Sequence, residues 1–325
     1  MITFFSTVKD SFLWLEVRFK RILQAIKLPG FGGARLNDVL VFFFRGLFKG
    51  AISYRAAAIA FNFFLSLIPF ILFLFSLVPF MTSHHYQAYL LDLLSDVIPS
   101  NIFQMVKGPL SEVISRPHQG LLSIVFLTAV YFATNGVDAI IEGFNQSYYR
   151  PETRSWWKQK LVAFFLMLIL AVLTFVSFTL LGFGEYLIRV LIRYHMIASQ
   201  LSILPLQLLR WFIILFATIF SVSILFYFGQ LKTLKSIKYM FFSAGSISTT
   251  VLLLAGISML KLYFENFSRY NLLYGSIGSL IILMVWVYYN SMMILVGFEL
   301  DYSIKVSLEH KILEQQIRES EESDT

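Results

Sequence analysis

The chain has 325 residues, of which 58% are hydrophobic, 17% aromatic and only 14% charged. Soluble proteins carry about a quarter charged residues, so this apolar surplus is too large for one buried core and part of it must face lipid. The composition therefore excludes an ordinary soluble enzyme and a disordered chain. The chain has no cysteine, which excludes disulfides, thiolate metal sites and a cysteine nucleophile.

Six stretches are long and apolar enough to cross a hydrocarbon layer as helices, which takes about 20 residues each. They cover approximately 56–80, 120–145, 161–184, 206–228, 239–260 and 272–300. These segments are too long for barrel strands and lack sustained alternation. We therefore expect an all-α integral membrane protein whose six-transmembrane-helix bundle occupies residues 51–302.

An N-terminal arm, residues 1–50, precedes the first span. Apolar residues recur every three or four positions from Phe5 to Ile26 and again from Leu36 to Leu47, and basic residues lie on the other faces. The pattern predicts amphipathic helices on the cytoplasmic membrane surface, held by anionic lipid. A regulatory, lipid-sensing arm and a structural collar packed on the bundle both remain open.

The distribution of positive charge predicts the orientation. Nineteen of the 26 Lys and Arg residues lie in the segment before the first span (residues 1–55), the second and fourth connections and the C-terminal tail, and six lie in segments on the other side. The positive-inside rule places both termini in the cytoplasm, with an external segment at 81–119 and an acidic cytoplasmic tail at 303–325. Topology thus accounts for the net charge of +7 without a nucleic-acid partner.

A polar stripe runs along the second predicted span. At about 100° per helical residue, its polar side chains fall within an arc of about 100°. They are Thr128, Tyr131, Asn135, Asp138, Glu142 and Asn145. Polar and ionisable groups are costly in hydrocarbon, so this stripe must face other helices or water.

Polar groups of two other spans are expected at the depth of this stripe. They are Arg55 and Asn62 in the first span and Glu299 at the end of the sixth. We expect a cytoplasm-facing cluster that binds an ion or a polar head group or relays a proton; the alternative is a bonded network that only locks the bundle. The cluster comprises Arg55, Asn62, Asp138, Glu142, Asn145 and Glu299.

Other residues point to helix packing rather than chemistry. Gly275 and Ser279, with Gly278 between them, form a small-residue pattern that permits close helix approach or a homo-oligomer. Pro69 is able to kink the first span and to free a backbone carbonyl. No common hydrolase, zinc-protease or nucleotide-binding motif is present. The pair His84 and His85 is typical of a solvated loop, so we expect no metal, no cofactor and no catalytic residue.

Three blocks of sequence resemble the YihY/BrkB family of bacterial inner-membrane proteins. They are residues 53–69, residues 135–154 and residues 274–300, within a resemblance that covers approximately 35–305. The resemblance implies six spans with both termini inside, a link to virulence, and a suspected transport role. Some members of this family carried a label as a tRNA-processing ribonuclease.

Three functions are compatible with these patterns. The first is a transporter or exporter of a solute, an ion or a lipid through a cavity lined by the polar stripe and Arg55. The second is a non-transporting scaffold or envelope-biogenesis factor in which the stripe only holds the helices together. The third is a membrane-embedded nuclease, which the lack of positioned acid–base groups on the cytoplasmic side disfavours.

Overall fold

The computed structural model describes residues 32–81, 108, 119–148, 154–193, 200–231, 240–267 and 270–323. The regular elements within these ranges are all helices, which confirms the all-α prediction for this part of the chain. In chain order they are α2 (Leu36–Lys49), α3 (Ile52–Met81), α6 (Gln119–Asn145), α7 (Trp156–Arg193), α8 (Gln200–Gly229), α9 (Ala244–Phe267) and α10 (Tyr270–Ser323).

Among the described residues, five helices are long and apolar enough to cross a bilayer. Their apolar stretches are Ile52–Ser76, Leu122–Asn145, Trp156–Gly184, Gln207–Gly229 and Leu280–Glu322. They overlap five of the six predicted spans. In α9 the described side chains form the apolar stretch Ala244–Met259, which is shorter than the roughly 20 residues that a crossing takes. Six spans therefore stay a prediction.

Large apolar side chains cover the outer faces of these helices. Phe175 and Phe178 of α7 are 72% and 71% exposed, and Trp211 of α8 is 66% exposed. A soluble surface rarely gathers so much apolar area. These faces are suited to contact with lipid chains, in agreement with the composition.

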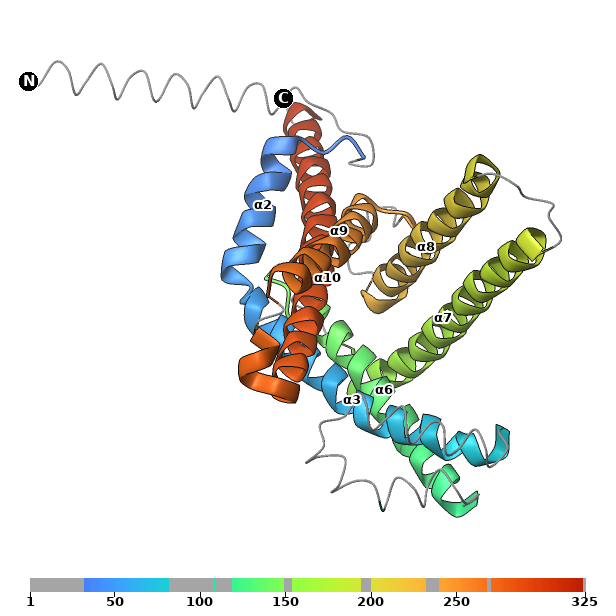
Figure 1. Ribbon diagram of the computed structural model, residues 1–325. Helices are drawn as coiled ribbons and strands as arrows, with labels where there is room; N and C mark the ends of the chain where they lie inside the picture. Colours follow the sequence, from blue (N-terminus) through green and yellow to red (C-terminus); the bar gives the residue numbers. More distant parts are fainter. Residues whose placement is uncertain are drawn as a thin grey trace, which may run out of the picture.

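The helices form one connected assembly around α10 (Figure 1). Helix α3 packs side by side with α6, and α10 contacts α3, α9 and α2 along its length. Helices α7 and α8 form an antiparallel pair that stands away from α2 (Figure 1). Because α6 packs against both α3 and α7, one of its faces lies between these two helices.

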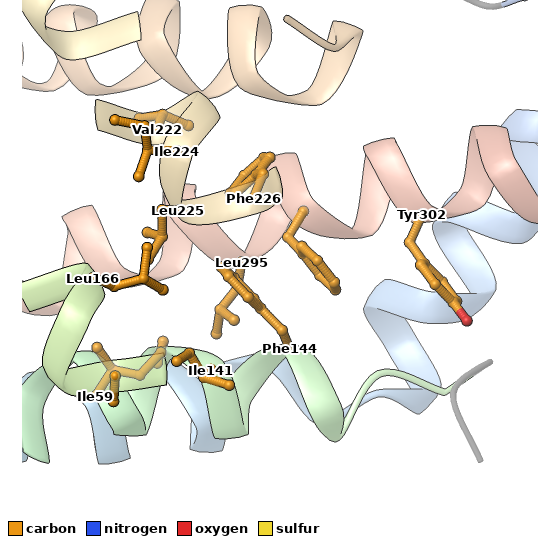
Figure 2. Close-up of a cluster of buried hydrophobic side chains, with 13 residues drawn as sticks. Ile59, Ile141, Phe144, Leu166, Val222, Ile224, Leu225, Phe226, Leu295 and Tyr302 are labelled. Atoms are coloured by element: carbon orange, nitrogen blue, oxygen red, sulfur yellow. The ribbon is translucent and has the colours of Figure 1, made fainter. Parts of the chain in front are cut away.

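A buried aromatic and aliphatic cluster joins α3, α6, α7, α8 and α10 (Figure 2). Phe144 of α6 stacks on Phe298 of α10 with ring centroids 4.0 Å apart, and the edge of Phe226 of α8 meets both rings. Ile141 and Leu295 are fully buried beside them. This cluster fixes one face of α6 in the core and leaves the opposite face free to carry polar groups.

Small residues allow α9 and α10 to approach closely. A Cβ atom added at Gly297 would overlap the Thr249 hydroxyl, one at Gly245 would overlap Asp301, and one at Gly256 would overlap the Tyr289 ring. The predicted packing residues Gly275, Gly278 and Ser279 lie in the first turns of α10, outside the residues whose side chains are described. The close contacts that the structure does describe were not predicted.

Proline does not interrupt the first span. Helix α3 continues from Ile52 through Pro69 to Met81. Because proline lacks an N–H, the carbonyl one turn earlier receives no helical hydrogen bond from position 69.

Helix α2 covers the second amphipathic piece that the sequence predicts. Its Val39 is buried against Ile304 of α10, whereas Phe44 and Phe48 are 50% and 83% exposed. The first piece, residues 1–31, and most of the predicted external segment 81–119 lie outside the described residues. Contact with the membrane surface therefore stays a prediction for the arm.

Helix α10 continues without interruption past the predicted end of the last span. Residues 301–305 are all buried, and Asp301 forms a 2.5 Å ion pair with Lys305. The first turn of the predicted tail 303–325 is thus part of the packed core. Only its later residues are exposed along the helix.

Candidate functional site

A groove of about 950 Å³ lies along the face of α6 that is turned away from the core. Helix α6 supplies half of its lining residues, the start of α3 forms one wall and the start of α7 forms the other. Its lining residues are Arg55, Ala58, Asn62, Leu127, Val130, Tyr131, Thr134, Asn135, Asp138, Ala139, Glu142, Gly143, Gln146, Trp156, Trp157, Lys160, Leu161 and Phe164. The helical periodicity of α6 explains why its polar residues share this one face.

The structure brings most of the predicted site residues into this groove. Those that line it are Arg55, Asn62, Tyr131, Asn135, Asp138 and Glu142. Thr128 lies outside it and donates its hydroxyl to the carbonyls of Ile124 and Val125 within α6. Asn145 and Glu299 lie behind the groove in the buried packing. The predicted cluster is therefore divided between a groove surface and a buried network.

The buried part of the network centres on an ion pair between α3 and α10. The Arg55 guanidinium lies 2.6 Å from the Glu299 carboxylate and also donates to the Gly143 carbonyl at 2.7 Å. The Ser147 hydroxyl donates to the second oxygen of Glu299 at 2.8 Å. Arg55 and Glu299 are 4% and 0% exposed, so neither charge has water to replace its partner. The ion pair and the hydrogen bond to Gly143 together join α3, α6 and α10.

A second ion pair lies on the groove surface. Lys160 at the start of α7 lies 2.6 Å from Asp138 of α6 and donates to the Asn135 side-chain oxygen at 2.7 Å. The Gln159 amide also donates to Asp138, at 2.9 Å. Both ion-pair partners are partly exposed, at 25% and 18% of the side chain. These bonds join α6 to α7.

Glu142 lies one turn along α6 from Asp138 and differs from it in its partners. Its carboxylate accepts hydrogen bonds from the amides of Gln146 at 3.0 Å and Gln159 at 3.2 Å. Within the part of the chain that the structure describes, no Lys or Arg pairs with it. The Gln159 oxygen in turn accepts a hydrogen bond from Asn145 at 2.7 Å.

The sequence analysis missed the contribution of α7. Lys160 and Gln159 are not among the predicted site residues, although they hold both carboxylates of the groove. The sequence analysis also overlooked Trp156 and Trp157, which line the groove at the same end. The available signal was the location of these polar residues in the first turn of a span, at the depth where the stripe of α6 ends.

A further unpredicted contact caps the C-terminal end of α8 near the start of α7. The Arg154 guanidinium donates to the carbonyls of Phe228, Gly229 and Gln230 at 2.9–3.0 Å. These carbonyls have no partners within the helix, and a cation is favourable at a helix C-terminus. Burial lowers the pKa of the Arg154 guanidinium from its usual range. Arg154 thus fixes the start of α7 against the end of α8.

The rim of the groove is apolar and open at the side. Leu127 and Tyr131 on α6 are 66% and 62% exposed, and Leu161 on α7 is 58% exposed. The groove therefore combines a charged floor with walls that are suited to lipid.

The comparison with known families covers nearly all of this helical region. Residues 43–321 match the model of the family described as virulence factor BrkB. The chain belongs to the BrkB family. This confirms the resemblance predicted from the three sequence blocks, and it makes the chain a membrane protein of that family.

Two relatives of this BrkB family chain have names that do not establish a function. A Bacillus subtilis (strain 168) protein named ribonuclease-like protein YfkH is 26% identical over 247 residues, covering 76% of this chain and 88% of that protein. A Psychromonas ingrahamii protein named UPF0761 membrane protein is 28% identical over 67 residues, or 21% of this chain and 23% of that protein. No solved structure matches the chain.

Proposed function

We propose that this BrkB family protein is a transporter or exporter in the bacterial inner membrane, with both termini in the cytoplasm. Its substrate, whether a solute, an ion or a lipid, moves along the groove on α6. The observation that carries the proposal is the volume of about 950 Å³ beside Asp138, Glu142 and Lys160. Charged groups in a membrane segment are costly and are found where a substrate or an ion passes.

A non-transporting scaffold is the second candidate, and a specific observation favours it. Arg55, Glu299, Asn145 and Asp138 all form hydrogen bonds or ion pairs with other helices. Such a network holds a bundle together whether or not anything passes through it. In this case the groove is a lipid-covered seam, and the partners are anionic lipids at the arm or a second copy of the chain.

We do not propose nuclease activity on the strength of a relative's name. Four of the five histidines lie outside the described residues, and the fifth, His310, lies on α10 beside Glu314 at 3.2 Å. The described residues contain no group of three or more His, Asp or Glu side chains that could hold a metal ion.

Water access to the groove separates transport from scaffolding. The chain has no cysteine, so single cysteines can be introduced without altering the native background. We would replace Tyr131, Asn135 and Glu142 in turn, reconstitute each variant, and label inverted membrane vesicles with a membrane-impermeant thiol reagent. Two positions on other faces of α6 serve as controls: Ile141 is fully buried in the core, and Ile124 is 63% exposed but does not line the groove.

Transport predicts labelling at all three groove positions and at neither control. A lipid-covered seam predicts that positions 131 and 135 resist the reagent as Ile124→Cys does. That second result, obtained from both faces of the membrane, would reject the transport proposal in favour of the scaffold.

A further inference from the structure

One of the four charged side chains that line the groove has no partner of opposite charge among the described residues. The two cations of the groove, Arg55 and Lys160, already form ion pairs at 2.6 Å. The Glu142 carboxylate, by contrast, accepts hydrogen bonds from two glutamine amides and has no cationic partner among the described residues. An unpaired carboxylate at the edge of a membrane segment is costly, and a bound cation would remove that cost.

Glu142 also has unused hydrogen-bonding capacity. An ionised carboxylate offers about four lone-pair sites, and the two amide hydrogen bonds occupy only part of them. A primary ammonium group carries three N–H donors and fits this free capacity. The side chain is partly exposed and lines the groove, so an ammonium group can reach it.

Two tryptophans that line the same groove favour a cation as well. Trp156 and Trp157 line the groove, are 61% and 77% exposed, and meet edge to face with ring centroids 4.5 Å apart. Indole faces attract ammonium groups, and one of them already lies 6.0 Å from the Lys160 ammonium. The exposed face of the other is available to a ligand.

The open side of the groove favours a lipid over a water-soluble amine. Leu127, Tyr131 and Leu161 form an exposed apolar rim around the polar floor. A lipid can place its head group on this floor while its acyl chains stay in the hydrocarbon layer. The distance along α6 from Tyr131 to Glu142 is about 16 Å, which is roughly half of the hydrocarbon thickness.

We propose that the groove binds a membrane lipid whose head group carries a protonated amine, and that Glu142 accepts hydrogen bonds from this amine. The inference rests on the proposed function, since it names the substrate class of the same groove. An anionic lipid without an amine gains nothing from Glu142 and is repelled by its charge.

Lipid retention by the purified full-length protein tests the proposal. The protein is incubated in mixed micelles with equal amounts of phosphatidylethanolamine and phosphatidylglycerol of matched acyl chains, and the lipids that remain bound after washing are counted by mass spectrometry. We expect roughly a tenfold preference for the amine lipid, because the free energy of one charge-assisted hydrogen bond corresponds to about a tenfold change in the dissociation constant. Glu142→Gln keeps the shape, removes the charge and can accept only one of the two amide hydrogen bonds, and it should lower the ratio roughly tenfold.

A matched control removes a carboxylate elsewhere. Glu319→Gln alters an exposed residue on the last turns of α10 and should retain the wild-type ratio. Equal thermal unfolding midpoints of the two variants show that folding is intact. Anionic lipid bound by the basic arm adds the same amount of phosphatidylglycerol to all three proteins, so the difference between the wild type and Glu142→Gln reports the groove.

Two results overturn the inference. The first is a ratio of the two lipids that Glu142→Gln leaves unchanged from the wild type. The second is displacement of a spin-labelled amine from the protein by spermidine without retention of phosphatidylethanolamine, because the occupant is then a soluble amine. Thiol labelling of the groove distinguishes this failure from failure of the transport proposal. A labelled groove without an amine preference leaves transport standing, and an amine preference in an unlabelled groove leaves only a bound lipid.

Discussion

At the scale of single residues, buried charge is the most demanding feature of this protein. Arg55 and Glu299 are almost completely buried and lie 2.6 Å apart, while Asp301 and Lys305 form a second buried pair at 2.5 Å on α10. Removing one member of a buried pair leaves an uncompensated charge in a low-dielectric site. The Arg55 Nε atom already lacks a partner, so this site has no spare acceptor to offer.

Glu299→Gln should therefore destabilise the folded protein by about 3–5 kcal/mol, because it removes the counter-charge of a buried guanidinium. The unfolding midpoint followed by tryptophan fluorescence in detergent measures the loss. Glu314→Gln is the control, since its partner His310 is largely exposed, and its midpoint should not move. The double variant Arg55→Met, Glu299→Met should recover most of the loss, and an unchanged midpoint for Glu299→Gln alone would contradict the argument.

At the scale of helices, contact between α9 and α10 depends on glycine. The backbone of α10 at Gly297 approaches Thr249 so closely that no side chain fits between them. Without a hydrophobic driving force between helices in lipid, such close van der Waals contact is a main source of association. The same contact places Asp301 against Gly245.

Gly297→Ala should separate α9 from α10 and destabilise the protein by about 1–3 kcal/mol, the usual cost of an overpacked core. Gly182→Ala on α7 is a matched control, because a Cβ atom there meets nothing within 4 Å. Its midpoint should stay the same or rise slightly, since alanine favours helix more than glycine does. Thermal unfolding of the two variants side by side decides the point, and equal behaviour would argue against the close contact.

Arg154 connects two other helices through backbone carbonyls. Arg154→Ala leaves the last carbonyls of α8 without these donors, so the end of α8 near Gly229 should open more readily. We expect faster amide hydrogen exchange in α8 around residues 224–230 and little change in α10. Arg154→Lys should restore only part of the protection, because an ammonium group lacks the planar fork that contacts three carbonyls. Unchanged exchange in Arg154→Ala would show that solvent replaces the guanidinium.

At the scale of the whole molecule, the number of spans and the orientation depend on each other. An even number of crossings places both termini on one side, and an odd number places them on opposite sides. The structure describes five helices that are long enough, and in α9 the described side chains cover only the apolar stretch Ala244–Met259. The charge distribution predicts the sixth crossing.

Thiol labelling of single-cysteine variants tests the six-span arrangement. Ser83→Cys, in the predicted external segment, should react with an impermeant reagent in intact cells. Ser6→Cys and Ser320→Cys, near the two termini, should react only in inverted vesicles. Labelling of the two terminal positions from opposite sides would show that the protein crosses the membrane an odd number of times and would reject the predicted orientation.

Local patterns determined the class of this protein. Hydropathy over about 20 residues identifies a span without knowledge of its neighbours, and helical periodicity places Asn135, Asp138 and Glu142 on one face. The three sequence blocks were sufficient for the family, and the family match over residues 43–321 confirms it. Each of these inferences depends on residues that are close together in the sequence.

Only the tertiary structure decided which polar groups meet. Arg55 finds Glu299 across 244 positions, and Asp138 finds Lys160 on a neighbouring helix, so sequence spacing carries no sign of either pair. The structure also divides the predicted cluster into a buried network and an open groove, because α6 packs its apolar face into the core and leaves its polar face between α3 and α7. Helical period says which residues share a face, and the packing of the other helices decides what that face meets.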